Sequence, residues 1–281
     1  MKTKFIAEIC SNHNGKLSRC LKFVDEAKRL NCFAVKFQLF KIDQLFAPEF
    51  IKKNKILKKR KKYELPKHFI PIIARYCKKK KIKFSCTPFH LDAVDQLKDY
   101  VDFFKIASYE ILWKELLVKC AKTKKPIVMS TGMATMSEVK KAYQILKKNG
   151  CKKIIILHCV SSYPAKIESC NLNSITYLRK KFRCEVGWSD HTVNPFVIYS
   201  AAVEKKADFI EFHLDLDGKG WEYNDAEHCW LPNQIVNLIK FLNNRNKILG
   251  KEVKVFSKSE VNERSYRSDP KDGLRPFIKL R

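Results

Sequence analysis

Apolar and polar positions follow two periods along the chain, and the two periods alternate in strict order. Short runs rich in β-branched and aromatic residues, typical of buried strands, occur at residues 5–9, 34–38, 83–87, 103–107, 127–131, 154–159, 185–189 and 209–213. Longer amphipathic stretches separate and follow them and predict helices at residues 17–30, 68–80, 91–97, 113–122, 137–148, 173–181, 195–205 and 232–244. This alternation predicts a single (β/α)8 TIM barrel over residues 1–250, with a short C-terminal extension over residues 251–281.

Local capping chemistry supports several of these boundaries. Ser137 is placed to cap the helix that follows it, and Asn149 with Gly150 marks the end of the same helix. Pro195 suits a first helical turn, where its missing N–H costs no hydrogen bond. The tail segment SDPKDGLRP, with its glycine and prolines, indicates an ordered loop rather than a helix.

Charge and cysteine content change this picture little. The formal net charge is +28, but the lysines are spread over predicted helix faces without a nucleic-acid-binding module, so we expect no nucleic-acid partner. One basic stretch, residues 52–69, is predicted to be a mobile loop. The eleven cysteines have no CxxC pair and no regular spacing, which favours reduced thiols in a cytoplasmic protein. No apolar run is long enough for a membrane helix or a signal peptide, so no membrane partner is expected.

A barrel of this kind carries its active site at the carboxyl ends of the strands. Strand alternation points Lys36 and Lys105 into the barrel, because their sequence neighbours are large apolar residues that must face the helices. A buried lysine needs an anionic partner. That partner is either a small phosphorylated or carboxylated ligand, or a glutamate of the fold itself such as Glu8 or Glu211.

Two histidines come from the ends of successive predicted strands. His191 lies in GWSDHT and His213 in IEFHLD. Imidazoles at neighbouring strand ends are suited to share a metal ion, although buried histidines often serve only as hydrogen-bonded core residues.

Eight ordered segments carry a resemblance to a known family. They are AEICSNHNG, AVKFQ, CTPF, FKIAS, STGMAT, LHCVSSYP, GWSDHT and IEFHLD, and they lie on the eight strand ends between residues 7 and 215. In this order they resemble the signature segments of the sialic acid synthase family, over roughly residues 4–245. The resemblance implies an enzyme of sialic acid biosynthesis that condenses phosphoenolpyruvate with an N-acylated hexose similar to N-acetylmannosamine. The products would be a nine-carbon 2-keto sugar acid and phosphate.

The resemblance also assigns roles to individual residues. His191 and His213 would bind a divalent metal, Mn²⁺ or Mg²⁺, with open positions for the sugar aldehyde. Glu8 would handle a proton, and Lys36 with Lys105 would bind phosphoenolpyruvate. The remaining predicted substrate-binding residues are Gln38, Thr87, Ser108, Ser130, Ser161, Tyr163, Ser189 and Asp225, with Glu227 a competitor for the last position.

The chain also departs from the family pattern. Cys10 and Ser11 stand where the family usually has a glycine and an apolar residue, which we expect to change only the packing behind Glu8. Relatives continue into an antifreeze-like domain that supplies an arginine to the sugar within a swapped dimer. Here an arginine of the tail (Arg264, Arg267 or Arg275), a different acceptor sugar or a separate lid-domain partner would have to compensate, and a homodimer is an open possibility.

Two other functions remain open from the sequence alone. A related 2-keto-acid synthase would use another aldose, such as a phosphorylated sugar, and a non-catalytic sugar-binding or scaffold barrel would do no chemistry. Glu8, Lys36, Lys105, His191 and His213 occur together, which argues against the scaffold because the fold alone does not need them.

Overall fold

The computed structural model describes residues 3–281 and contains a closed barrel of eight parallel strands. The strands are β1 (Lys4–Glu8), β2 (Ala34–Leu39), β3 (Lys83–Pro88), β4 (Phe103–Ile106), β5 (Ile127–Ser130), β6 (Ile154–Cys159), β7 (Val186–Asp190) and β8 (Phe209–His213). Each strand pairs with the next in sequence, and β8 pairs with β1, which closes the sheet. The predicted (β/α)8 fold is therefore confirmed.

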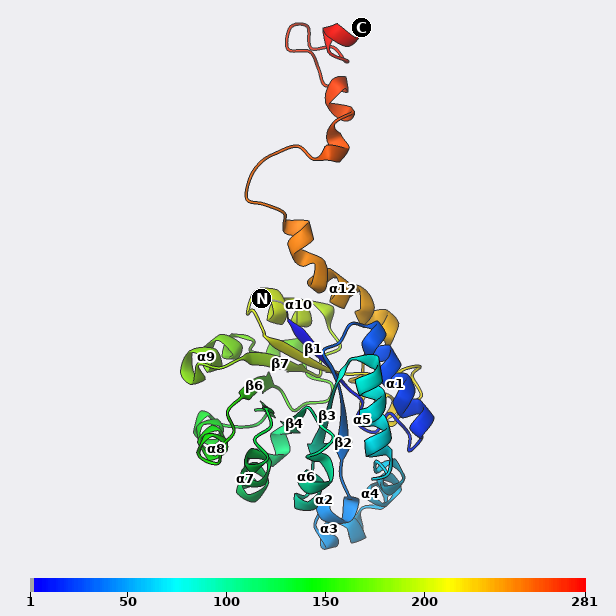
Figure 1. Cartoon of the computed structure of the whole chain (residues 1–281), viewed down its shortest axis with the longest axis vertical. Coiled ribbons are helices and arrows are strands. Elements are labelled where there is room, and N and C mark those ends of the chain that lie inside the picture. The colour runs from blue at the N-terminus through cyan, green and yellow to red at the C-terminus, as the bar shows by residue number, and fades with distance from the viewer. Residues whose placement is uncertain (1–2) are drawn as a thin grey trace. The chain divides into compact units, whose positions relative to one another are not determined.

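Helices surround the barrel (Figure 1). The principal ones are α1 (Leu17–Arg29), α5 (Phe69–Lys80), α6 (Leu91–Leu97), α7 (Lys114–Lys122), α8 (Met136–Lys148), α9 (Asn173–Phe182), α10 (Pro195–Val203) and α12 (Pro232–Leu249). Their apolar faces and the outward residues of the strands form the main core, in which Phe37, Phe104 and Phe212 are fully buried.

The interior of the barrel changes character from one end to the other. A small apolar cluster that includes Ile6, Ala34, Val128 and Phe209 fills the amino-terminal half. The residues two positions further along these strands point to the same inner face, because side chains alternate with a period of two. Several of these residues are charged. Charged side chains consequently lie at the carboxyl end of the barrel, which is where this fold places its active site.

The start of α8 differs from the prediction. Its N-cap is Thr135, whose hydroxyl accepts from the backbone N–H of Glu138, while the Glu138 carboxylate accepts from the Thr135 N–H. This capping box satisfies two helix-start donors at once, so Ser137 lies inside the first turn instead. The predicted end of this helix at Asn149 and the first-turn position of Pro195 in α10 are both confirmed.

The basic stretch at residues 52–69 is not a mobile loop. The stretch contains the end of α3 (Pro48–Lys53), α4 (Lys55–Arg60) and η1 (Lys61–Tyr63), and the short helix α2 (Ile42–Leu45) precedes it. Ile51 and Leu57 are buried in a separate apolar cluster with Phe40 and Phe89. The lysines face outward around these few anchors, which is why composition alone suggested a loop.

The described residues divide into two compact units, one ending at Asn243 and one spanning Asn244–Arg281. The division therefore falls within α12 rather than after residue 250. In the second unit the predicted ordered loop is confirmed, because the Asp269 carboxylate accepts hydrogen bonds from the backbone N–H groups of Lys271 (2.9 Å) and Ile278 (2.8 Å).

The three tail arginines are held within or exposed on this second unit. The Arg264 guanidinium lies 4.1 Å from the centroid of the Phe256 ring, and Arg275 Nε donates to Ser268 Oγ at 3.4 Å. Arg267 is exposed. Their expected role toward the sugar stays a prediction.

The cysteines and helices agree with the sequence on two further points. All eleven cysteines are free thiols, and ten of them are buried. Over residues 3–281, none of the helices combines the length and the apolar character that crossing a bilayer requires.

Candidate active site

Four charged side chains lie buried inside the carboxyl half of the barrel. They are Glu8 of β1, Lys36 of β2, Lys105 of β4 and Glu211 of β8. Lys36 forms an ion pair with Glu8, and its Nζ lies 3.7 Å from Glu211 Oε1. The Nζ of Lys105 lies 3.3 Å from the same oxygen. The interior position of both lysines is confirmed. Of the two kinds of partner that the sequence left open, glutamates of the fold meet both lysines in this structure.

These four groups have very different proton affinities. Burial raises the pKa of Glu8 to about 7, against the influence of Lys36, and the charge of Glu211 raises it further. Burial also opposes ionisation of Glu211, but Lys105 and Lys36 outweigh it and lower its pKa to about 2. Burial lowers the pKa of Lys105, whereas the two glutamates outweigh burial at Lys36 and raise its pKa. Glu8 is thus the member that changes its protonation near neutral pH.

Three predicted substrate residues hydrogen-bond to this charged group. Gln38 Nε2 donates to Glu8 Oε1 at 3.0 Å, and Ser189 Oγ donates to Glu211 Oε1 at 3.3 Å. Thr87 Oγ1 accepts from the β2 lysine at 3.2 Å. The structure therefore brings these polar side chains to the carboxyl end of the barrel, as predicted.

Three predicted serines lie near a glycine at the barrel mouth. The Gly132 N–H donates to Ser108 Oγ at 3.0 Å, and a Cβ at position 132 would lie 2.2 Å from Ser161 Oγ and 2.9 Å from Ser108 Oγ. Only glycine allows the two hydroxyls to approach this backbone. The hydroxyls of Ser130 and Ser161 are buried and have no hydrogen-bond partner within residues 3–281. Such hydroxyls are available to an oxyanion.

The two predicted metal ligands lie side by side. The ring centroids of His191 and His213 are 5.2 Å apart. His191 Nδ1 lies 2.7 Å from the carbonyl oxygen of Val160, so it donates its N–H there and leaves Nε2 free. A fixed tautomer of this kind is typical of a metal-binding imidazole, so the residues fit a shared divalent ion. The Tyr163 ring lies 4.4 Å from that of His191 and is partly exposed.

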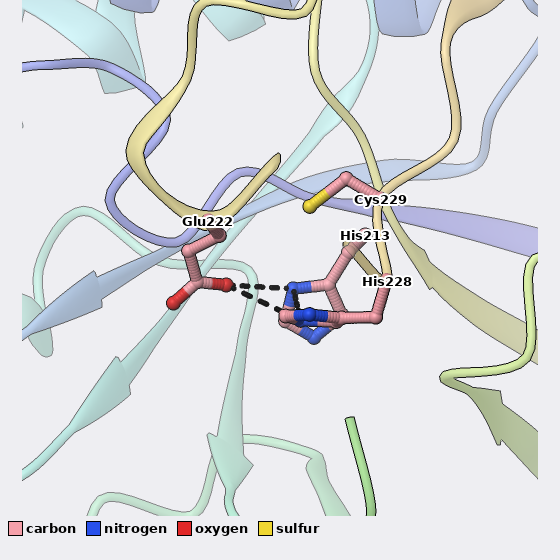
Figure 2. A group of neighbouring side chains, drawn as sticks. All are labelled: His213, Glu222, His228 and Cys229. Atoms are coloured by element: carbon pink, nitrogen blue, oxygen red, sulfur yellow. Dashed lines mark hydrogen bonds and ion pairs between the residues drawn. The ribbon is translucent and has the colours of Figure 1, made fainter. Parts of the chain in front are cut away.

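The sequence did not reveal two buried residues beside this pair. Glu222 is the second residue of the short helix α11 (Trp221–Ala226), and His228 follows that helix. Figure 2 shows both side chains directed at His213: Glu222 Oε2 and His228 Nε2 lie 3.0 Å and 3.1 Å from His213 Nδ1. By contrast, Asp225 and Glu227 are exposed. A role of either one toward the sugar stays a prediction.

The electrostatics of this second group favour a neutral imidazole at His213. Burial lowers the pKa of His213 to about 3, assisted by the nearby His228 and opposed by Glu222. Burial disfavours ionisation of Glu222, but the hydrogen bonds from the two histidines outweigh it and hold its pKa well below the usual range. The group therefore combines an unprotonated carboxylate with the neutral imidazole of His213.

Cys10 does more than pack behind Glu8. Its backbone N–H donates to Glu8 Oε1 at 3.0 Å, and its thiol donates to Glu222 Oε1 at 2.6 Å. Cys10 adopts a positive φ of 44°, which allows both contacts. The expectation of a packing change alone is therefore wrong for Cys10, because the residue links the proton-binding glutamate to the histidine group. Ser11 is fully buried.

Comparison with known proteins places this site in a family. Residues 23–254 match the NeuB family. The chain is 36% identical over 272 residues to an N,N'-diacetyllegionaminic acid synthase of Campylobacter jejuni, covering 92% of this chain and 81% of that protein. The chain belongs to the NeuB family.

Other comparisons agree with this NeuB assignment. An uncharacterised protein of Methanocaldococcus jannaschii is 37% identical over 259 residues, covering 92% of this chain and 75% of that protein. A crystal structure of the N-acetylneuraminic acid synthetase of Leptospira borgpetersenii, in complex with citrate, matches with a TM-score of 0.80 and 31% identity. That match covers 95% of this chain and 92% of the other.

These findings confirm the predicted resemblance, the barrel fold and the enzyme class of a NeuB synthase. The metal, the acceptor sugar and the individual roles of the site residues stay predictions.

Proposed function

We propose that this NeuB-family enzyme condenses phosphoenolpyruvate with an N-acylated hexose to form a nine-carbon 2-keto sugar acid and phosphate. The observation that carries the proposal is the buried group of two lysines and two glutamates beside unpartnered serine hydroxyls. The C. jejuni relative, a synthase of a diacetylated sugar acid by name, supports an acceptor that carries acylamino groups.

Lys36, Lys105 and the serines would bind phosphoenolpyruvate. Its phosphate and carboxylate need cations and donors in a site from which water is largely excluded. Both lysines are almost fully buried, and the hydroxyls of Ser130 and Ser161 have no competing partner in the part of the chain that the structure describes. Substrate oxyanions would therefore replace part of the glutamates' contact with the lysines.

Glu8 would accept the proton from the water that adds at C2. In the reaction, C3 of phosphoenolpyruvate bonds to the sugar aldehyde carbon, whose oxygen takes up a proton and becomes a hydroxyl. Water bonds to C2 and the C2–O bond to phosphate breaks, so the water oxygen becomes the 2-keto oxygen and its two protons end on the new hydroxyl and on the released phosphate. A general base works best with a pKa near the working pH, and burial sets that of Glu8 to about 7. Gln38 and Cys10 fix the carboxylate through hydrogen bonds to Glu8 Oε1.

His191 and His213 would hold the divalent ion, Mn²⁺ or Mg²⁺, in this proposal. When bound, the ion supplies Lewis acidity that polarises the aldehyde of the sugar. Val160 orients His191 through its carbonyl, and Tyr163 packs against the His191 ring at the open side of the site. The aromatic ring of Tyr163 offers an apolar face and a hydroxyl to the sugar.

The test is release of phosphate from phosphoenolpyruvate, measured with a panel of 2-acetamido and 2,4-diacetamido hexoses, with Mn²⁺ or with chelator. We expect release that depends on one class of sugar and that falls by at least ~100-fold in His213→Ala or Lys105→Met. Lys119→Met, on the exposed surface of α7, is the matched control and should retain full activity.

Other outcomes point elsewhere. Release only with a phosphorylated aldose would establish the related 2-keto-acid synthase. Binding of phosphoenolpyruvate without turnover on any sugar would indicate that a further domain or partner completes the site. If the chain neither binds phosphoenolpyruvate nor releases phosphate from it with any sugar, the proposed function is refuted and the scaffold function is left.

A further inference from the structure

Three ligand-type atoms converge beside the predicted metal pair. His213 Nδ1 lies 3.0 Å from Glu222 Oε2 and 3.1 Å from His228 Nε2, and the last two atoms are 3.5 Å apart. All three side chains are buried (Figure 2). They come from the end of β8, from α11 and from the segment after α11, so the fold rather than local sequence brings them together.

Protons on neutral rings satisfy these contacts only if both histidines donate to Glu222 Oε2, which leaves the 3.1 Å contact between the two ring nitrogens without a proton to share. If His213 Nδ1 donates to Glu222, it has no lone pair for an N–H of His228. If it accepts from His228 instead, its own lone pair faces the carboxylate. In addition, His228 Nδ1 is buried and makes no hydrogen bond to any of residues 3–281. A cation among the three atoms removes the conflict, because each atom then directs a lone pair at positive charge.

The spacing of the three atoms suits such a cation. Metal–ligand bonds of ~2.1 Å at angles between ~90° and ~109° separate neighbouring ligand atoms by ~3.0–3.4 Å. The observed separations of 3.0 and 3.1 Å lie in this range, and that of 3.5 Å lies just above it.

The surrounding chain holds Glu222 in this position. Its second oxygen accepts from the Cys10 thiol, and its backbone N–H donates to Asn12 Oδ1 at 2.8 Å. The preceding Gly220 is packed so closely that a Cβ would lie 2.4 Å from Asn12 Oδ1. Cys229 also lies near the group, and its Sγ accepts from Asn12 Nδ2 at 3.3 Å.

We propose that His213, Glu222 and His228 form a two-histidine, one-carboxylate site for a divalent transition metal. The inference rests on the proposed function, since the ion would be the one that polarises the sugar, but its ligands beside the predicted His213 are Glu222 and His228, and His191 lies outside this three-atom set. Imidazole-rich sets prefer Mn²⁺, Fe²⁺, Co²⁺ or Zn²⁺, whereas Mg²⁺ prefers oxygen ligands and water. The enzyme should therefore bind Mn²⁺, Co²⁺ and Zn²⁺ much more tightly than Mg²⁺.

The metal affinity of the full chain tests this ligand set. It is measured by titration calorimetry with Mn²⁺, Co²⁺ and Zn²⁺ in the absence of substrates. Loss of an outer-shell partner typically costs 10–100-fold in affinity, so loss of a direct ligand should exceed ~100-fold. We expect that loss in His213→Ala, Glu222→Gln and His228→Ala. Asp99→Asn and Glu115→Gln, exposed carboxylates outside the site, are the matched controls and should bind as wild type.

Pulsed electron paramagnetic resonance with Cu²⁺ as the probe counts imidazole ligands directly. His228→Ala should lower the count by one, and His228→Gln with circular dichroism guards against misfolding. The inference would be overturned if the imidazole count were unchanged in His228→Ala and the metal affinity of Glu222→Gln fell by less than ~10-fold. His191 with His213 would then be left as the ligands. A drop of 10–100-fold without a change of count would also overturn it, because Glu222 would then only orient His213.

The two proposals can fail separately. A chain that binds metal through this set but releases no phosphate with any sugar keeps the metal site and refutes the proposed function. A chain that releases phosphate while Glu222→Gln and His228→Ala bind metal normally keeps the function and refutes the site.

Discussion

Lys36→Met removes one positive charge from the barrel interior at nearly constant side-chain volume. Lys36 meets Glu8, Glu211 and Thr87, so after the change Lys105 alone faces two carboxylates. Leaving a buried charge without its partner costs ~3–5 kcal/mol. The protein can avoid this cost by taking up a proton, and Glu8, whose pKa is already raised to about 7, is the group that would do so.

The loss of stability should therefore depend on pH. Below about pH 7, Glu8 is protonated in both folded proteins, and the difference in unfolding free energy is small and constant. Above about pH 7, Glu8 ionises in the folded wild type. In Lys36→Met the pKa of Glu8 is higher, so Glu8 stays protonated in the folded state although it is ionised in the unfolded chain. The folded variant then binds more protons than its unfolded chain, so its stability falls relative to wild type by ~1.4 kcal/mol per pH unit, up to ~3–5 kcal/mol.

Urea unfolding at pH 6, 7, 8 and 9 measures this difference, with the fluorescence of the buried Trp188 and Trp230 as the signal. Lys61→Met is the control, because Lys61 forms an exposed pair with Asp43 at 2.7 Å. That variant should lose less than ~1 kcal/mol at every pH. A Lys36→Met difference that is the same at pH 6 and pH 9 would refute the reasoning, since Glu8 would then not respond to the lysine.

Three further predictions follow from the site. Gly132→Ala places a methyl group 2.2 Å from Ser161 Oγ, so the KM for phosphoenolpyruvate should rise by at least ~10-fold. Circular dichroism should show an intact fold. An unchanged KM would show that the Ser161 hydroxyl does not bind substrate. Asp190→Asn weakens a buried carboxylate that accepts from two indole N–H groups, and should cost ~2–3 kcal/mol in urea unfolding, against less than ~1 kcal/mol for the exposed Asp95→Asn. Because the ionised form of Glu8 would be the base, kcat/KM should rise with pH through about 7, and a profile that is flat from pH 6 to pH 8 would contradict that role.

The barrel could be predicted because each strand and helix repeats a local pattern. Strand alternation also predicted the direction of Lys36 and Lys105, since a charged residue between large apolar neighbours has only one face of the strand open to it. The capping box of Thr135 and Glu138 matches the pattern T-x-x-E in the sequence, but Ser137, two residues further on, is also a residue type that favours an N-cap.

The helices in residues 48–63 were harder to predict. Their lysines dominate the composition, and only a few residues such as Ile51 and Leu57 anchor them in a small apolar cluster. Burial of those anchors depends on Phe40 and Phe89, which belong to other segments, so no local period announces it.

The sequence by itself determined the fold class, the carboxyl-end location of the site and the buried lysines, because these depend on periods of two and 3.6 residues. Only the tertiary structure decided that Glu222 and His228 lie against His213 while Asp225 is exposed. The contacts that fix this choice, from Cys10 and Asn12 to Glu222, join residues 212 and 210 positions apart. Hydrogen bonds between such distant segments form only once the barrel brings β1 and β8 together, so they leave no periodic trace in the sequence.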